Sequence, residues 1–186
     1  MLSLSEEDRG AILAATRQSV LHAVAHGQPS ANFPGTGVFA QPCGLFVTLH
    51  VHGKLRGCIG VIEARCSLGE SLVRCAADAA LHDPRFSPLR AEEIAGLEIE
   101  VSLLSPMLPI SPEDVEIGRH GLLVERGLRR GLLLPQVATE HRLSREQFLA
   151  ETCFKAGLPR DAWRDPQTIL YGFECVIVAG ASRSPK

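Results

Sequence analysis

Residues 44–62 read GLFVTLHVHGKLRGCIGVI, and this stretch decides the fold class. Residues 44–51 alternate in the manner of a β-strand, and residues 55–62 form a second strand-like run. The segment His52-Gly53-Lys54 between the two runs is a turn signal. The pattern predicts a β-hairpin, so the sheet that contains it has antiparallel strands.

The register of this hairpin determines which side chains share a face. With a two-residue loop, odd positions of the first strand oppose even positions of the second. This register predicts that Leu49 shares the face of Arg56 and Cys58, whereas His50 and His52 point away. An extra bulge residue would reverse the assignment.

The rest of the chain mixes helical and strand patterns without regular βαβ alternation and without an internal repeat. Ser5, Ser67 and Ser144 each stand where a helix cap is expected. Helices are predicted at residues 5–25, 67–80 and 144–156, and further strands at residues 97–104, 122–124, 132–134 and 169–179. The sequence therefore predicts an antiparallel β-sheet with helices packed on it, which is the α+β class.

Composition excludes several classes of protein. The 186 residues are 45% hydrophobic and 22% charged, which is enough to bury a core. The net charge of -2 comes from 19 basic and 21 acidic residues without blocks of either sign, which argues against a nucleic-acid partner. The N-terminus lacks the order of a signal peptide and no apolar run reaches membrane-spanning length, so we expect a cytoplasmic protein without membrane contact. The six cysteines contain no Cys-x-x-Cys pair, which argues against a zinc ribbon.

Cys58 is the residue with the strongest chemical signal. It lies between Gly57 and Gly60, and glycine in a strand marks the close approach of a ligand or of another backbone. A nearby guanidinium from Arg56 would favour the thiolate and make Cys58 a nucleophile. The alternative is that Cys58 is a small buried core residue and Arg56 a surface charge.

A cysteine nucleophile needs a base, and the chain offers seven histidines. We favour His120 as the partner because it lies between Gly118 and Gly121, where backbone crowding is low. The alternative is a surface histidine in a turn. Glu100 lies opposite the apolar positions of its strand, so it is a functional carboxylate if its face meets Arg56 and a solvated strand position otherwise.

Two further groups offer polar side chains. In the turn His82-Asp83-Pro84-Arg85-Phe86, Asp83 and Arg85 either hold a loop by a salt bridge or present polar groups to a substrate. His50 and His52 could chelate a metal, but two imidazoles alone make an incomplete site. We expect neither a metal nor another cofactor.

The motif Leu55-Arg56-Gly57-Cys58-Ile59-Gly60 is highly specific, and the order in which it and several other segments follow one another along the chain is more specific still. Those segments are residues 44–49, 83–89, 97–102, 121–122 and 131–138. Together they resemble the AMMECR family, whose bacterial and archaeal members are called AmmeMemoRadiSam system protein A. The resemblance covers nearly the whole chain.

The resemblance implies one AMMECR-like domain over residues 1–186, with an α+β fold in which about residues 110–160 contribute a smaller lobe beside a larger one. It also implies association with a Memo-like protein and a radical SAM protein. The family motif at residues 55–60 has no settled biochemical role.

Two functions fit these observations, and the sequence does not decide whether the protein is an enzyme. In the first, Cys58 is a nucleophile or covalent carrier, Arg56 holds an anionic group of a small molecule, and His120 or Glu100 moves protons. Its substrate-binding candidates are Arg56, Gly57, Gly60, Asp83 and Arg85. In the second, the chain is a non-catalytic adaptor that docks a Memo-like or radical SAM partner.

Overall fold

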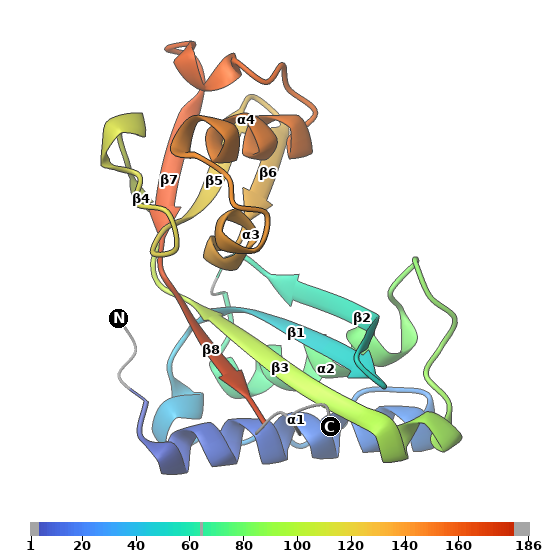
Figure 1. Cartoon of the computed structure of the whole chain (residues 1–186). Helices are drawn as coiled ribbons and strands as arrows, with labels where there is room; N and C mark the ends of the chain where they lie inside the picture. Colours follow the sequence, from blue (N-terminus) through green and yellow to red (C-terminus); the bar gives the residue numbers. More distant parts are fainter. Residues whose placement is uncertain (1–3, 64, 181–186) are drawn as a thin grey trace. The chain divides into compact units, whose positions relative to one another are not determined.

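The computed structural model describes residues 4–63 and 65–180 (Figure 1). Its elements are α1 (Glu6–His26), η1 (Gly37–Ala40), β1 (Gly44–Val51), β2 (Lys54–Val61), α2 (Leu68–Leu81), η2 (Ala91–Gly96), β3 (Leu97–Leu104), β4 (Leu108–Pro109), η3 (Pro112–Asp114), β5 (Gly121–Arg126), β6 (Arg129–Leu133), α3 (Pro135–Glu140), α4 (Arg145–Lys155), η4 (Ala162–Arg164), β7 (Ile169–Phe173) and β8 (Cys175–Ala179). The strands form two four-stranded sheets, ordered β2-β1-β3-β8 and β4-β7-β5-β6. The α+β class and the antiparallel hairpin are confirmed.

The chain divides into two compact units. The larger unit contains residues 4–104 and 176–180, and the smaller unit contains residues 105–175. The segment 110–160, for which the resemblance implies a smaller lobe, lies within the smaller unit.

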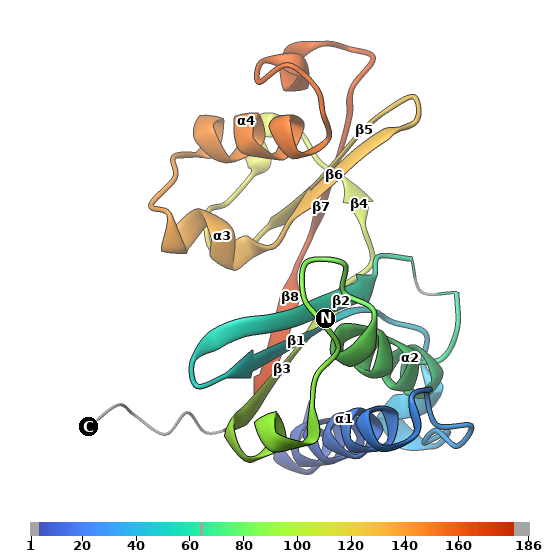
Figure 2. The same cartoon turned by 90° about the vertical axis from the view of Figure 1, so that its right-hand side faces the viewer.

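In the larger unit, α1 and α2 cover one face of the sheet β2-β1-β3-β8 (Figure 2). Each helix begins at a predicted serine cap: Ser5 accepts from the backbone N–H of Asp8, and Ser67 accepts from that of Glu70. The odd positions of β1 face these helices. The buried side chains between sheet and helices include Leu45, Val47 and Leu49 of β1, Ile12 and Val20 of α1, and Leu68 and Leu72 of α2.

The smaller unit packs α4 on the hairpin β5-β6. Ser144 and Gln147 form the predicted capping box at the start of α4. Gly131 of β6 allows a close approach, because a Cβ there would lie 2.4 Å from the backbone nitrogen of Ala156. The core of this unit includes Leu122, Val124, Phe148, Leu149 and Cys153.

The prediction of one strand over residues 169–179 is wrong. The strand is interrupted at Glu174, so β7 joins one sheet and β8 joins the other. At the break, the N–H of Ser105 donates to the Glu174 carbonyl at 2.9 Å, and the N–H of Glu174 donates to Ser105 Oγ at 2.9 Å. The apolar run therefore serves two sheets, which its alternation alone did not indicate.

Candidate functional site

A β-bulge decides which side chains lie near Cys58. The turn pairs Val51 with Lys54 and His50 with Leu55, but the next pair is Leu49 with Gly57. Arg56 is therefore one extra residue on β2, and every later residue of this strand changes face. Cys58 lies opposite Thr48 instead of sharing the face of Leu49. The predicted face assignment is wrong because of this extra residue.

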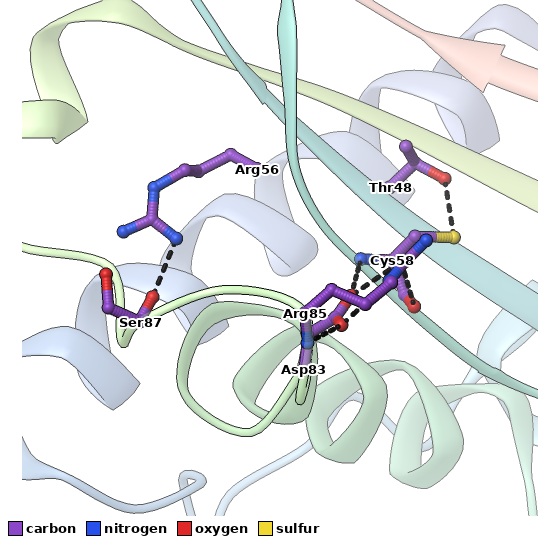
Figure 3. A network of polar contacts seen from close by, with 6 residues as sticks. All are labelled: Thr48, Arg56, Cys58, Asp83, Arg85 and Ser87. Carbon is purple, nitrogen blue, oxygen red and sulfur yellow. Dashed lines mark hydrogen bonds and ion pairs between the residues drawn. The ribbon is translucent and has the colours of Figure 1, made fainter.

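Arg56 makes its contacts in the loop that follows α2. Its Nε and Nη2 donate to the two carboxylate oxygens of Glu93 at 2.7 and 3.0 Å. Nη1 donates to the Ser87 carbonyl at 2.7 Å, and Nη2 also donates to the Pro88 carbonyl at 3.1 Å. Figure 3 shows the side chain extending toward Ser87 and away from Cys58. The guanidinium thus anchors a loop, and the expectation that it lies beside the Cys58 thiol is wrong.

The residues that hold Cys58 are Asp83 and Arg85. The Cys58 N–H donates to Asp83 Oδ2 at 2.8 Å, and Arg85 Nη2 donates to the Cys58 carbonyl at 3.4 Å. Because β2 is an edge strand, this pair takes the place of a neighbouring strand and satisfies both backbone groups of Cys58 (Figure 3). Asp83 and Arg85 are joined by an ion pair with an Nη2–Oδ2 distance of 2.7 Å.

The ion pair of Asp83 and Arg85, here called the clamp, stays charged. Hydrogen bonds from the Arg85 side chain, with further ones from the N–H groups of Cys58 and Arg85, hold the pKa of the Asp83 carboxyl well below its ordinary range against the opposing effect of burial. The same ion pair raises the pKa of Arg85. Asp83 is buried, whereas the Arg85 side chain is 54% exposed. The clamp is therefore ionised across the physiological pH range.

The Cys58 thiol itself is half-buried and is not part of the hydrophobic core. Its Sγ lies 3.3 Å from Thr48 Oγ1, across the strand pair. By contrast, Cys43, Cys75 and Cys153 are buried, and burial raises the pKa of the Cys75 thiol to about 11. The alternative in which Cys58 is a buried core residue is wrong.

The face of the larger sheet that is turned away from α1 and α2, here called the thiol face, carries a row of polar side chains. Thr48 pairs with Cys58 on one side and with Glu100 on the other, and His50 pairs with Glu98. Residues directly opposite each other point to the same face. Glu100 therefore shares the face of Cys58, with one strand between them, and does not share the face of Arg56.

His50 is the residue that sequence reasoning missed. The expected register turned it away from Cys58, but the bulge at Arg56 places both residues on the thiol face. A signal for the bulge was present, since a glycine inside a strand often marks one, and Gly57 follows the extra residue directly.

The thiol face also carries Ser102, which pairs with Phe46. Ser102 is buried, and within residues 4–63 and 65–180 its hydroxyl has no hydrogen-bond partner. A buried hydroxyl of this kind is expected to meet a water or a ligand.

The two glycines of the motif serve packing. A Cβ on Gly57 would lie 2.0 Å from the Ala79 carbonyl oxygen, so the approaching backbone is that of α2. A Cβ on Gly60 would lie 2.3 Å from the Leu45 carbonyl oxygen and 2.4 Å from the ring of Phe46. Of the two alternatives for Gly57, a ligand or another backbone, the structure supports the second.

His120 belongs to the smaller unit. Its Nδ1 accepts a hydrogen bond from the Glu116 N–H at 3.1 Å, inside the turn that precedes β5. This contact is local, and the pairing of His120 with Cys58 stays a prediction.

Neither a metal-binding cluster nor a membrane-spanning helix is present among the described residues. Among residues 4–63 and 65–180 there is no group of three or more His, Cys, Asp and Glu side chains placed to hold a metal ion. None of the helices in that part of the chain is both long and apolar enough to span a membrane.

An open cavity of about 470 Å³ lies within the smaller unit. None of the residues singled out in the sequence lines it. Its walls are formed by Ile110, Ser111, Pro112, Glu113, Trp163, Arg164, Asp165, Pro166, Thr168 and Leu170.

Comparison with known proteins identifies the family. A family model described as AMMECR1 matches residues 13–178. The chain belongs to the AMMECR1 family. A relative from Methanothermobacter thermautotrophicus is 49% identical over 147 residues, which cover 75% of this chain and 77% of that protein. Protein MK0488 of Methanopyrus kandleri is 39% identical over 184 residues, which cover 94% of this chain and 89% of its own length.

A solved structure agrees with the fold. The uncharacterized protein PH0010 from Pyrococcus horikoshii matches with a TM-score of 0.82 and 37% identity, over 94% of this chain and 92% of that one. The family and the fold class expected from the resemblance are both confirmed. The names of these AMMECR1 relatives state no activity, so the chemistry of the site has to come from its residues.

Proposed function

We propose that this AMMECR1-family chain is an enzyme or enzyme component in which Cys58 acts as a nucleophile or covalent carrier on the thiol face. One observation carries the proposal. The N–H and the carbonyl of Cys58 are both held by the buried Asp83 and its partner Arg85, while the thiol is half-buried with Thr48 Oγ1 at 3.3 Å. The ion pair therefore fixes the backbone from which the thiol projects.

The clamp supports nucleophilic chemistry because a reacting atom must be held in place. Fixing the backbone of a nucleophile removes motion that would otherwise be lost in the transition state. Thr48 can donate a hydrogen bond to the sulfur once the thiol has lost its proton. In the reaction, the thiol proton passes to a base, and Sγ forms a bond to an electrophilic atom of the substrate while the bond from that atom to its leaving group breaks. The leaving group departs with the bonding electron pair.

Arg85 is the residue best placed to hold an anionic group of the substrate. Its Nε and Nη2 donate to Asp83 and Cys58, but Nη1 donates no hydrogen bond within the described residues. The side chain is 54% exposed, so a carboxylate or phosphate can reach it. Arg85 therefore replaces Arg56 as the proposed binding residue for the anionic group, because Arg56 is paired with Glu93.

The test is the rate of alkylation of Cys58 by iodoacetamide, read by peptide mass spectrometry between pH 5 and 10. Cys66 and Cys175 are the internal controls because both are half-buried like Cys58. We expect Cys58 to react at least about tenfold faster than both at pH 7, because its backbone is held in place and Thr48 Oγ1 can donate a hydrogen bond to the attacking sulfur. A Cys58 no more reactive than its controls would refute the catalytic proposal.

The resemblance also supports a Memo-like protein and a radical SAM protein as partners. We propose that the edge formed by β2, where Leu55 is 41% exposed, contributes to that contact. The purified partner proteins would be titrated against the wild-type chain and Leu55→Ser, with Leu128→Ser at the β5-β6 turn as a control. If binding depends on Leu55 while Cys58 is unreactive, the protein is an adaptor and not an enzyme.

A further inference from the structure

We infer that His50 is the proton acceptor for the Cys58 thiol, an inference that rests on the proposed nucleophilic role of Cys58. Thr48 is directly opposite Cys58, and His50 is two residues farther along the same strand. The two side chains therefore point to the same face as diagonal neighbours. Diagonal neighbours in an antiparallel pair are about 7–8 Å apart at the backbone, a gap that an imidazole and a thiol can bridge.

The neighbours of His50 suit a protonated imidazole. Glu98 lies directly opposite on β3, and Glu100 is the diagonal neighbour there. A carboxylate close to an imidazole favours its charged form. The three strands thus place a thiol, an imidazole and a carboxylate in spatial order, from Cys58 on β2 through His50 on β1 to Glu98 on β3.

The ring of His50 is free to take part. Among the described residues neither of its nitrogens has a hydrogen-bond or ion-pair partner, whereas His82 is paired with Asp78 and His120 accepts from Glu116. His50 is also half-buried, so it is only partly exposed to solvent.

The proton step changes no net charge. The proton moves from Cys58 Sγ to a ring nitrogen of His50, which leaves a thiolate beside an imidazolium. The charged groups around this pair are Glu98 and Glu100 from β3 and the Asp83–Arg85 clamp at the edge of β2. The Arg85 guanidinium lies on the Cys58 side of the pair, and the two glutamates lie on the His50 side.

A second observation on the same face points to a ligand. The buried hydroxyl of Ser102 has no partner among the described residues, and it follows Glu100 by two positions on the same side of β3. A polar substrate lying along the thiol face would supply the missing hydrogen bond.

The experiment is the pH profile of Cys58 alkylation in four histidine variants. Iodoacetamide forms an S–C bond while the C–I bond breaks and iodide leaves, so the rate follows the thiolate fraction. We expect His50→Gln to move the inflection upward and to lower the rate at pH 7 by about tenfold, the effect of one pH unit. His52→Asn is the matched control, since His52 lies in the same hairpin turn at φ 51, a backbone conformation that Asn tolerates.

The outcomes separate this inference from the proposed function. A shift in His50→Gln, confirmed in His50→Asn and absent from His52→Asn, supports the inference. If Cys58 is alkylated selectively and its pH profile is unchanged in both His50 variants, the inference is overturned and the proposed function stays intact. If the loss of reactivity is confined to His120→Gln, the inference is overturned in favour of His120 as the proton acceptor. If wild-type Cys58 reacts no faster than Cys66 and Cys175, the proposed function fails and the inference fails with it.

Discussion

Replacing Asp83 with alanine tests the clamp on the edge of the larger sheet. The carboxylate accepts hydrogen bonds from the Cys58 N–H, from the Arg85 N–H and from Arg85 Nε and Nη2. The two bonds to the guanidinium are partly replaced by water, because the Arg85 side chain is more than half exposed. The two backbone N–H groups lose a charged acceptor, so we expect the free energy of unfolding to fall by about 3 kcal/mol.

The loss depends on pH in a direction set by the depressed pKa of Asp83. A carboxyl with a lowered pKa in the folded state stabilises the protein fully above its unfolded pKa of about 3.9, and this contribution disappears as pH falls toward the folded value. The difference between wild type and Asp83→Ala is therefore constant from pH 5 to 8 and shrinks below about pH 4.

Urea unfolding followed by circular dichroism at pH 7 and pH 3 measures this difference. The single tryptophan, Trp163, lies in the smaller unit, so its fluorescence reports whether the two units unfold together. Asp78→Ala is the control, because Asp78 is a half-exposed partner of His82 and its loss is expected to cost less than about 1 kcal/mol. A cost below 1 kcal/mol for Asp83→Ala, or one that is equal at both pH values, would refute the reasoning.

Three further variants and one chemical probe test other parts of the structure. Gly57→Ala is expected to lower the free energy of unfolding by about 2–3 kcal/mol, because the new Cβ meets the Ala79 carbonyl of α2; chemical denaturation measures it. Gly10→Ala, on an open surface of α1, is expected to raise it by about 0.5–1 kcal/mol in the same assay. Arg56→Lys loses the bidentate contact with Glu93 and is expected to cost about 1–2 kcal/mol. Cys75, with its pKa raised to about 11, is expected to resist alkylation at pH 8 in the folded protein and to react once the protein is unfolded in urea.

Local patterns in the sequence determined most of the elements. Ser5, Ser67 and Ser144 mark the starts of helices because each side chain satisfies an N–H group within its own first turn. The turn at His52-Gly53 and the alternation on both sides of it determined the hairpin, because the two paired strands are adjacent along the chain. Contacts between residues that are close along the chain can be predicted from the chain alone.

The composition of the site was partly predictable. Cys58, Asp83 and Arg85 were all singled out, and the structure brings these three into direct contact. Glu100 lies on the polar side of its strand, as predicted, but the condition that its face meets Arg56 is not fulfilled, because that face is the one of Thr48 and Cys58.

Only the tertiary structure decided which side chains face the thiol. The bulge depends on contacts far along the chain, namely those of Arg56 with Glu93 and of Gly57 with the backbone of α2. One extra residue reverses the face of every position after it, so the residue opposite Cys58 is Thr48 and not Val47, which a register without the bulge would place there. The sequence by itself determined that a hairpin carries the cysteine, and the packing of α2 and its following loop determined where that cysteine points.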